Sequence, residues 1–481
     1  MKKILLVGAE AMPFAATGGL GDVLGSLPAA LAAAPDTDVR VMMPLYAQIP
    51  DSFRKKMKTE AVFTVKLAWR EQYCGILSLK RKGVTYYFVD NEYYFHRAAL
   101  YGSFDDGERF AFFSMAVLES LWHLGFFPDV LHANDWQSAL TVVYLDRLYR
   151  QRPGYTNIRS VFTIHNIEYQ GKYDFYILGD VFSLGADCRD LMNFGGCINL
   201  MKAAIVVADR VTTVSPRYAE EICTPAYGHG LDGILRDNRG KLSGILNGID
   251  YDYYNPGQDA EIPVKYNRNT LSRKVENKTA LQRELGLPED PDVPMLAIVS
   301  RLAAHKGMDL AADIMPRLLF ERNVQLVVLG RGEAGYENFF RDLERRFPAK
   351  VRAMILYDRA LAKRIYAACD IFLMPSKSEP CGLSQMVASR YGAIPVTRET
   401  GGLFDSIKGY WKEEKDGKTV LHGNGFTFAN YRSEELSDRI SAALDLYEDP
   451  ATCRLFVRKI MQIDFSWKQS AAGYLALYHA I

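Results

Sequence analysis

Short apolar runs alternate with longer amphipathic stretches along the chain, a pattern typical of a parallel β-sheet wrapped by helices. In the first half, the apolar runs predict strands over residues 4–7, 39–43, 86–89, 130–132, 161–164, 211–214 and 243–246. Helix-like stretches lie between them, for example over residues 109–124 and 139–149. This half of the chain is therefore expected to form a doubly wound α/β domain.

The pattern breaks at Asn247-Gly248-Ile249-Asp250, and a polar stretch with one helix-like piece continues to Pro294. It then restarts, with strands expected over residues 296–299, 324–329, 353–356, 371–374, 394–396 and 425–428. We therefore predict two Rossmann-like α/β domains, residues 1–248 and residues 249–465. A last helix, over about residues 467–478, lies beyond the final strand, and the pattern alone lets it pack on either domain.

Composition is that of an ordinary globular protein, because 48% of the 481 residues are hydrophobic and 24% are charged. The 58 basic and 57 acidic residues nearly cancel, so no broad basic surface is expected for nucleic acid or for an anionic membrane. No apolar run reaches the roughly 18 residues of a membrane span. Any anionic ligand must therefore be bound locally.

Seven cysteines are scattered through the chain, without a Cys-x-x-Cys pair. An odd number of cysteines without paired spacing favours neither a disulfide framework nor a zinc site. We therefore expect a cytoplasmic protein with no metal.

Two hexapeptides nearly repeat each other, Thr17-Gly18-Gly19-Leu20-Gly21-Asp22 and Thr400-Gly401-Gly402-Leu403-Phe404-Asp405. Each is typical of a glycine-rich turn that opens a helix, where backbone N–H groups and the helix dipole favour an anion. One such turn in each half predicts a cleft between two domains that holds one phosphorylated ligand. A tight strand-to-helix turn alone is the competing interpretation.

Polar residues follow several of the predicted strands, at the edge where open α/β sheets bind ligands. Asp135 and His165 follow two strands of the first half, and Arg301 and Lys306 follow the first strand of the second half. Two cations there would suit a diphosphate leaving group. Glu379, in Glu379-Pro380-Cys381-Gly382-Leu383, could bind sugar hydroxyls or stabilise positive charge at an anomeric carbon.

Each of these residues has a structural alternative. A cation pair is often a solvated face, a lone histidine is often structural, and an acid at a helix start often only complements the dipole. Gly330-Arg331-Gly332-Glu333-Ala334-Gly335 also matches a dinucleotide fingerprint, although Glu333 would place an anion inside the phosphate turn. The aromatic residues at 86, 87 and 93–95 fit either sugar stacking or a core.

Together these motifs resemble the bacterial glycogen synthases and plant starch synthases, the ADP-glucose-dependent glucosyltransferases of GT-B fold. The likeness runs from residue 4 to the last helix. It depends on eight motifs in order, at residues 17–20, 132–136, 163–166, 246–250, 300–302, 305–307, 379–383 and 399–403.

The resemblance implies a GT-B enzyme that transfers glucose, with retention, from ADP-glucose to the non-reducing 4-hydroxyl of an α-1,4-glucan such as glycogen, with no cofactor. It implies that Arg301 and Lys306 hold the diphosphate and that Glu379 binds the donor glucose. It also implies that the terminal helix, residues 466–481, packs back on the first domain. The other site residues that it implies lie around the sugar, the phosphates and the adenine: Asp135, His165, Asn247, Thr17, Gly18, Gly19, Gly330, Tyr357, Cys381, Gly382, Leu383, Thr400, Gly401 and Gly402.

The chain departs from the family pattern at Ala16, where the family has a lysine that contributes to donor binding. Lys377-Ser378 and Arg359 also replace more usual residues, and Arg359 lies beside the expected adenine-stacking Tyr357. Two alternatives therefore stay open beside the glucan synthase. One is a catalytically weak glucan-binding or regulatory homologue, and the other is a GT-B enzyme that uses another nucleotide-glucose.

Overall fold

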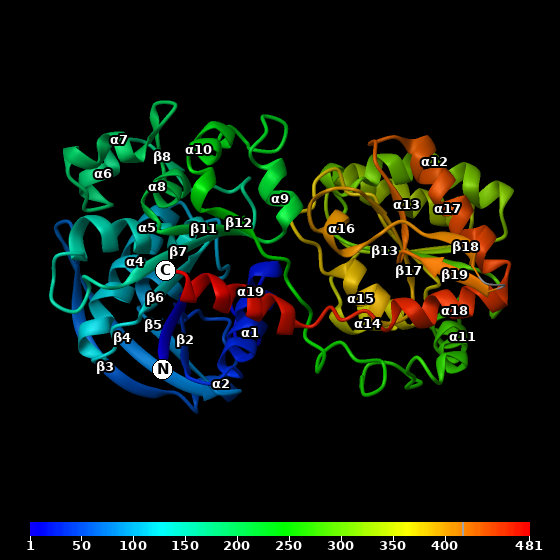
Figure 1. Cartoon of the computed structure of the whole chain (residues 1–481), viewed down its shortest axis with the longest axis horizontal. Coiled ribbons are helices and arrows are strands. Elements are labelled where there is room, and N and C mark those ends of the chain that lie inside the picture. The colour runs from blue at the N-terminus through cyan, green and yellow to red at the C-terminus, as the bar shows by residue number, and fades with distance from the viewer. Residues whose placement is uncertain (416–417) are drawn as a thin grey trace. The chain divides into compact units, whose positions relative to one another are not determined.

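The structure is a computed structural model that describes residues 1–415 and 418–481. Its internal contacts divide the chain into two units (Figure 1). The first unit joins Met1–Asn247 to the terminal segment Trp467–Ile481, and the second is the continuous segment Gly248–Ser466. No helix within the described residues is both long and apolar enough to cross a membrane.

The first unit is built on a nine-stranded sheet of order β12-β11-β7-β6-β1-β2-β5-β4-β3. Its strands are β1 (Lys2–Val7), β2 (Thr37–Pro44), β3 (Lys58–Leu67), β4 (Arg70–Arg81), β5 (Val84–Asp90), β6 (Val130–Asn134), β7 (Arg159–Ile164), β11 (Arg210–Thr213) and β12 (Leu242–Gly244). Neighbours pair in parallel except around β4, which is antiparallel to both β3 and β5. A separate small sheet contains β8 (Lys172–Tyr173), β10 (Cys197–Asn199) and β9 (Asn193–Phe194).

Helices of the first unit connect these strands. They are α1 (Gly19–Ala32), α2 (Asp51–Arg54), α3 (Glu92–Phe95), α4 (Asp106–His123), α5 (Trp136–Tyr144), α6 (Ile177–Asp180), α7 (Arg189–Met192), α8 (Leu200–Val207), α9 (Pro216–Glu221), α10 (Asp232–Asp237) and the terminal α19 (Trp467–His479). The stretch predicted as one helix over residues 139–149 is α5 followed by a π-helical turn, Leu145–Tyr149.

The terminal helix α19 packs on the first unit beside α1 (Figure 1). Trp467, Ala471, Tyr474 and Tyr478 are all buried, and their spacing places them on one helical face. The Tyr478 hydroxyl lies 2.6 Å from Nδ1 of buried His132, whose Nε2 lies 2.5 Å from Thr163 Oγ1 on β7. Burial lowers the pKa of His132 to about 3, so this imidazole is neutral at pH 7.

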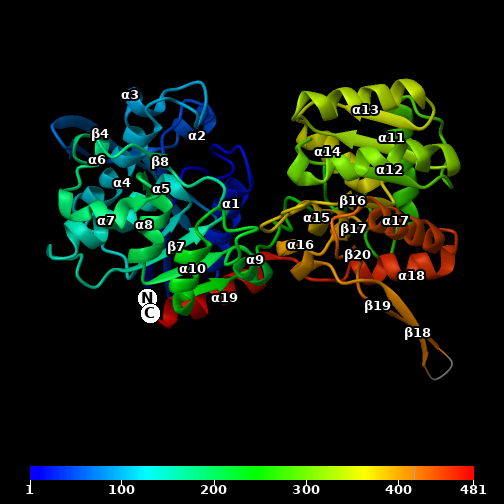
Figure 2. The same cartoon turned by 90° about the horizontal axis from the view of Figure 1, so that it is seen from above.

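The second unit is built on a parallel six-stranded sheet of order β15-β14-β13-β16-β17-β20. Its strands are β13 (Met295–Val299), β14 (Gln325–Leu329), β15 (Val351–Met354), β16 (Ile371–Met374), β17 (Ile394–Arg398) and β20 (Phe426–Phe428). A hairpin of β18 (Trp411–Lys415) and β19 (Lys418–His422) projects from this unit (Figure 2). Its helices are α11 (Lys274–Leu285), α12 (Met308–Glu321), α13 (Ala334–Arg346), α14 (Arg359–Ala368), α15 (Ser384–Arg390), α16 (Gly401–Ser406), α17 (Ser433–Tyr447) and α18 (Pro450–Ile460).

These two sheets confirm the predicted α/β fold class, and every predicted strand overlaps an observed one. The boundaries shift by a few residues, most clearly in the seventh predicted strand, where β12 ends at Gly244 rather than at residue 246. The hairpin β3–β4 was not predicted. Much of β3 is exposed, and its exposed apolar residue Val62 makes its pattern unlike that of the buried parallel strands.

Candidate active site

The order of strands in the second unit fixes where its ligand-binding loops lie. The chain moves from β13 outward to β14 and β15, and then returns to place β16 on the other side of β13. Loops that follow such a pair of strands diverge and leave a crevice at their carboxyl ends. Residues 300–307 follow β13 and residues 375–383 follow β16, so two of the predicted motifs border this crevice.

An ion pair joins the two loops. Lys306 Nζ lies 2.6 Å from Glu379 Oε2, and the same oxygen accepts a hydrogen bond of 3.1 Å from the Ser376 hydroxyl. The Glu379 side chain is 7% exposed and that of Lys306 is 20% exposed. Because both charges are largely removed from water, their interaction is less screened than that of a surface pair. This pair can exchange partners with an anionic ligand.

The backbone holds Lys306 in place. Gly307 has φ +75°, and a Cβ built there would lie 2.2 Å from the Pro375 carbonyl oxygen. The Lys377 N–H donates to the His305 carbonyl at 2.9 Å. The glycine thus permits the close approach that locks the lysine loop onto the loop after β16.

Arg301 is exposed and makes no hydrogen bond or ion pair through its side chain in the described chain. Tyr357, which follows β15, has 75% of its surface exposed, and Arg359 Nε donates to its hydroxyl at 2.7 Å. A cation and an exposed aromatic ring are therefore both available to a ligand of this unit.

The second glycine hexapeptide opens α16, as predicted, with Thr400 as the N-cap. Gly401 has φ +44°, and a Cβ there would lie 2.0 Å from the Glu379 carbonyl oxygen. The Gly402 N–H donates to the Glu379 and Pro380 carbonyls, and a Cβ on Gly402 would lie 2.1 Å from the Cys381 carbonyl oxygen. These glycines therefore fit closely against the backbone that carries Glu379.

The adjoining Gly382 has φ +68°, and Leu383 is the N-cap of α15. The Gln385 amide donates to the Cys381 and Gly382 carbonyls, at 3.2 Å and 2.9 Å. The left-handed turn that glycine permits at residue 382 and these two bonds fix the segment that follows Glu379.

The dinucleotide-like motif after β14 has a packing explanation. A Cβ on Gly330 would lie 1.8 Å from the Ser300 carbonyl oxygen, and one on Gly332 would lie 2.0 Å from the Leu302 carbonyl oxygen. The Glu333 carboxylate accepts the Ala304 N–H at 3.1 Å. These two glycines admit the neighbouring loop after β13, and the acid binds that loop.

The first unit has a crevice of the same kind, because β6 returns to the side of β1 opposite β2. Asp135 follows β6 with φ +57°, a strained value for a residue other than glycine. Its Oδ1 accepts the His165 N–H at 2.7 Å and the Asn166 N–H at 3.4 Å. Burial nevertheless raises the pKa of the Asp135 carboxyl to about 7.

His165 lies beside this carboxylate at the end of β7. Its Nε2 is 2.9 Å from Asn134 Oδ1, while the Asn134 amide donates to the Val7 and His132 carbonyls. Since Asn134 Oδ1 can only accept, Nε2 carries the proton of the imidazole. Burial lowers the pKa of His165 to about 3, so it is a neutral donor or acceptor at pH 7.

The first glycine hexapeptide also opens its helix as predicted, with Gly18 as the N-cap of α1. Backbone N–H groups of this turn donate hydrogen bonds to a carboxylate of the protein itself. The Glu10 carboxylate accepts the Thr17 N–H at 2.6 Å, the Thr17 hydroxyl at 2.7 Å and the Gly18 N–H at 3.1 Å, and it also binds the Tyr101 hydroxyl. Gly19 is exposed beside this turn.

Asn247 ends the first unit, three residues after β12. It is buried, and its Oδ1 has no hydrogen-bond partner within the described residues. Such an atom is unusual in a folded protein and suits a ligand donor.

The aromatic residues at 86, 87 and 93–95 divide between core packing and possible sugar stacking. Tyr86, Tyr87, Tyr94 and Phe95 belong to the buried core, while Tyr93 is 64% exposed. Only Tyr93 therefore remains available for stacking on a sugar ring.

Each unit thus gathers its own predicted residues at strand ends. The first brings Asp135 and His165 together, and the second brings Lys306, Glu379 and the 400–402 turn together. Sequence reasoning did not assign Glu10, Asn134 or Ser376. Asn134 lies within a motif that it used, whereas Ser376 lies three residues before Glu379 and Glu10 lies seven residues before Thr17. No cluster of metal-binding side chains was found in residues 1–415 and 418–481.

Comparison with known proteins gives matches over the whole chain. Residues 3–237 match the family described as starch synthase catalytic domain, and residues 278–459 match glycosyl transferases group 1. The chain is 46% identical to a glycogen synthase of Bacillus subtilis and 47% identical to one of Clostridium perfringens, in each case over 100% of this chain and 98% of the relative. The solved catalytic domain of starch synthase IV from Arabidopsis thaliana, bound to ADP and acarbose, superposes with a TM-score of 0.89. It has 35% identity and covers 100% of this chain and 99% of that one.

Proposed function

The chain belongs to the glycogen and starch synthase family of glycosyltransferases, and from this premise we propose that it transfers glucose from ADP-glucose to the non-reducing 4-hydroxyl of an α-1,4-glucan. In this reaction the bond between glucose C1 and the β-phosphate oxygen breaks, and ADP leaves with the electron pair. A new bond joins C1 to the acceptor oxygen, which loses its proton.

The observation that carries this proposal is the Lys306–Glu379 pair at the carboxyl ends of β13 and β16. A leaving diphosphate gains negative charge while the glucosyl C1 gains positive charge. Lys306 and Arg301 would stabilise the charge on the diphosphate, and the Glu379 carboxylate would stabilise the charge at C1. One cation, one anion and one hydroxyl already held in place require little reorganisation when these charges form.

The glycine turn at residues 400–402 and Gly330 would border the phosphates, because the absence of side chains at these glycines permits close approach. Tyr357 would stack on the adenine. Cys381, Gly382 and Leu383 would shape the backbone that presents Glu379 to the sugar.

Residues of the first unit would recognise sugar hydroxyls. His165 offers a neutral imidazole and Asp135 a carboxyl that titrates near neutral pH, so both can exchange hydrogen bonds with hydroxyl groups. Asn247 offers a buried carbonyl oxygen without a partner in the described chain. Thr17, Gly18 and Gly19 would approach the donor from the turn that Glu10 organises.

All seven cysteines are free thiols, which supports a reducing cytoplasm as the place of the reaction. We propose glycogen as the acceptor there.

The test is incubation of the purified protein with ADP-glucose and glycogen, with ADP release and glucan extension both measured. UDP-glucose is assayed beside it, because Ala16 and Arg359 alter the expected donor site. We expect ADP-glucose to be preferred and the new linkage to be α. Absence of transfer from any nucleotide-glucose would contradict the proposal.

Two variants, Lys306→Met and Glu379→Gln, test the role of the Lys306–Glu379 ion pair. Removing one preorganised charge from a transition state lowers kcat by about 10²- to 10³-fold. The exposed ion pair Arg317–Glu321 of α12 provides matched controls, Arg317→Met and Glu321→Gln, which should retain normal kcat. Near-normal turnover in Lys306→Met or Glu379→Gln would refute the assigned role.

A further inference from the structure

A cavity of about 650 Å³ lies in the second unit at the amino ends of its strands. Pro294 precedes β13, Val324 precedes β14 and Asp370 precedes β16, and all three line the cavity. Arg301 and Glu379 follow the carboxyl ends of β13 and β16, at the opposite edge of the sheet. The cavity is therefore separate from the proposed donor site, and its volume is typical of small-molecule sites.

Ten of its 22 lining residues are aliphatic or proline. Helices α11, α17 and α18 and the turns before the strands contribute, among others, Val275, Pro294, Val324, Ile394, Leu444 and Val457. Such walls suit an apolar or aromatic body better than a sugar, whose hydroxyl groups would lose their hydrogen bonds with water.

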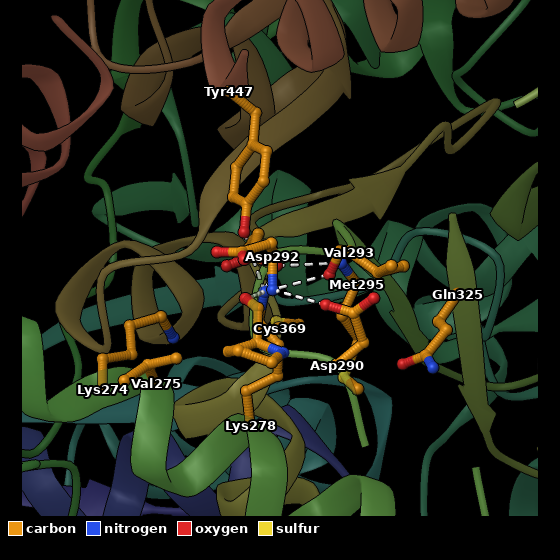
Figure 3. A network of polar contacts seen from close by, with 12 residues as sticks. Lys274, Val275, Lys278, Asp290, Asp292, Val293, Met295, Gln325, Cys369 and Tyr447 are labelled. Atoms are coloured by element: carbon orange, nitrogen blue, oxygen red, sulfur yellow. Dashed lines mark hydrogen bonds and ion pairs between the residues drawn. The ribbon is translucent and has the colours of Figure 1, made fainter. Parts of the chain in front are cut away.

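Two lysines of α11, one turn apart, line the cavity and differ in their partners (Figure 3). Lys278 Nζ lies 2.7 Å from Asp370 Oδ2 and also donates to the Tyr447 hydroxyl and to the Pro291 and Val293 carbonyls. With four acceptors around three protons, its charge is neutralised and its hydrogen-bonding capacity is filled.

Lys274 has no carboxylate partner in the described chain. Its Nζ donates to the Tyr366 and Ala367 carbonyls, at 3.1 Å and 2.9 Å, at the end of α14. Two neutral acceptors leave one proton of the ammonium without an acceptor in the described chain, although the residue is only 8% exposed. The Tyr266 ring lies 5.9 Å from Nζ, and the neighbouring Asp370 carboxylate is already held by Lys278. A buried cation that shares its neighbouring carboxylate with another lysine favours an anion in the adjoining cavity.

We propose that this cavity is a binding site for a small amphipathic anion, whose apolar ring system packs on the aliphatic walls and whose anionic group pairs with Lys274. Four cationic side chains and three carboxylates line the cavity in all. Lys278 pairs with Asp370, and Arg322 lies 3.6 Å from Glu448, so these four charges are compensated within the protein. Asp292 and Arg454 form no ion pair in the described chain, and their opposite charges cancel in the count, which leaves the positive charge of Lys274 in excess.

The pH dependence of binding follows from the groups around Lys274. Burial lowers the pKa of Lys274 to about 8. Cys369, Cys453 and Tyr447 have pKa values raised to about 12, and the pKa of Lys278 is also raised. The acidic groups that face the cavity are Asp292, Asp370 and Glu448, and its other cationic side chains are Arg322 and Arg454. Between pH 7 and pH 9, loss of the Lys274 charge should therefore weaken the binding of an anion and leave the binding of a neutral analogue unchanged.

The test uses anilinonaphthalene sulfonate, an aromatic anion that fluoresces in apolar sites, and phenylnaphthylamine, which has the same rings without the sulfonate. Both are titrated into the full chain. Lys274→Met keeps the length of the side chain and removes its charge. We expect this substitution to lower the affinity for the sulfonate about tenfold and to leave the affinity for phenylnaphthylamine unchanged. From pH 7 to pH 9, wild-type affinity for the sulfonate should fall and that of Lys274→Met should not.

Two valines of similar exposure provide a test that does not depend on Lys274. Val275 lines the cavity and is 39% exposed, while Val206 on α8 of the first unit is 37% exposed. Val275→Trp should fill the cavity and abolish binding of both probes, while Val206→Trp should not. A signal that survives Val275→Trp, or equal loss of both probes in Lys274→Met, would overturn the proposal. These outcomes do not depend on glucosyl transfer.

Discussion

The strongest quantitative prediction concerns Asp135→Asn. Asparagine tolerates the positive φ of this position and keeps an amide oxygen for the His165 N–H, so the backbone of the loop can stay as it is. The substitution removes a carboxyl whose pKa rises from 3.8 to about 7 on folding. It therefore isolates the energetic effect of burying this acid.

A raised pKa in the folded state stabilises the protein most below pH 3.8, and that contribution is lost as the pH rises through about 7. Between pH 5 and pH 7 the unfolded chain has already released this proton while the folded chain still holds it. Each pH unit in that window removes about 1.4 kcal/mol of stability. The free energy of unfolding of wild type should thus fall by about 2 to 3 kcal/mol relative to Asp135→Asn between pH 5 and pH 8.

Urea denaturation at pH 5 and pH 8, followed by tryptophan fluorescence, measures this difference. The chain has five tryptophans, and only Trp411 lies in the second unit. In a Trp411→Phe background the signal therefore reports on the first unit, which contains Asp135. Other titrating groups are common to both proteins and cancel in the comparison. Parallel pH dependence in the two proteins would refute the reasoning.

Three further predictions concern the packing around the sites. Gly401→Ala should abolish transfer and lower the melting temperature, because its Cβ would lie 2.0 Å from the Glu379 carbonyl oxygen, whereas Gly335→Ala, with no atom within 4 Å of the added Cβ, should alter neither. Tyr478→Phe should destabilise the first unit by about 1 to 3 kcal/mol in the same urea assay, because Nδ1 of buried His132 loses its partner, while exposed Tyr176→Phe should have no effect. Buried, neutral His165 has a pKa lowered from 6.5 to about 3, so wild type should lose about 2 kcal/mol more than His165→Gln as the pH falls from 7 to 5. Equal losses would show that His165 is not buried in its neutral form.

Hydrophobic periodicity was sufficient to predict the core strands of both sheets, because parallel strands buried on both faces are continuous apolar runs. Hydrophobic periodicity did not predict the hairpins β3–β4 and β18–β19. Every described residue of β18 is exposed, and Trp411 lies among charged neighbours, so no buried run marks the strand. The π-helical turn at Leu145–Tyr149 also has no signature in the apolar spacing.

Motifs, and the resemblance that they support, identified the family correctly, as the comparisons confirm. They could not show how the residues are held. The partnership of Glu379 with Ser376, and that of Glu10 with the first glycine turn, depends on folded geometry that spacing does not encode. The glycines of residues 330–332 show the reverse difficulty, since a pattern typical of phosphate binding also arises where two loops approach closely. The roles assigned to individual site residues remain predictions.

The division of the chain has a consequence for its synthesis. Residues 248–466 form one uninterrupted unit, whereas the other unit needs both ends of the chain. Translation proceeds from the amino terminus, so residues 1–247 are made first but cannot complete their core until α19, which is encoded after the whole second unit, has been made. Until Tyr478 emerges, His132 has no phenol to bind, and a nascent chain stalled before that point would retain an incomplete amino-terminal core.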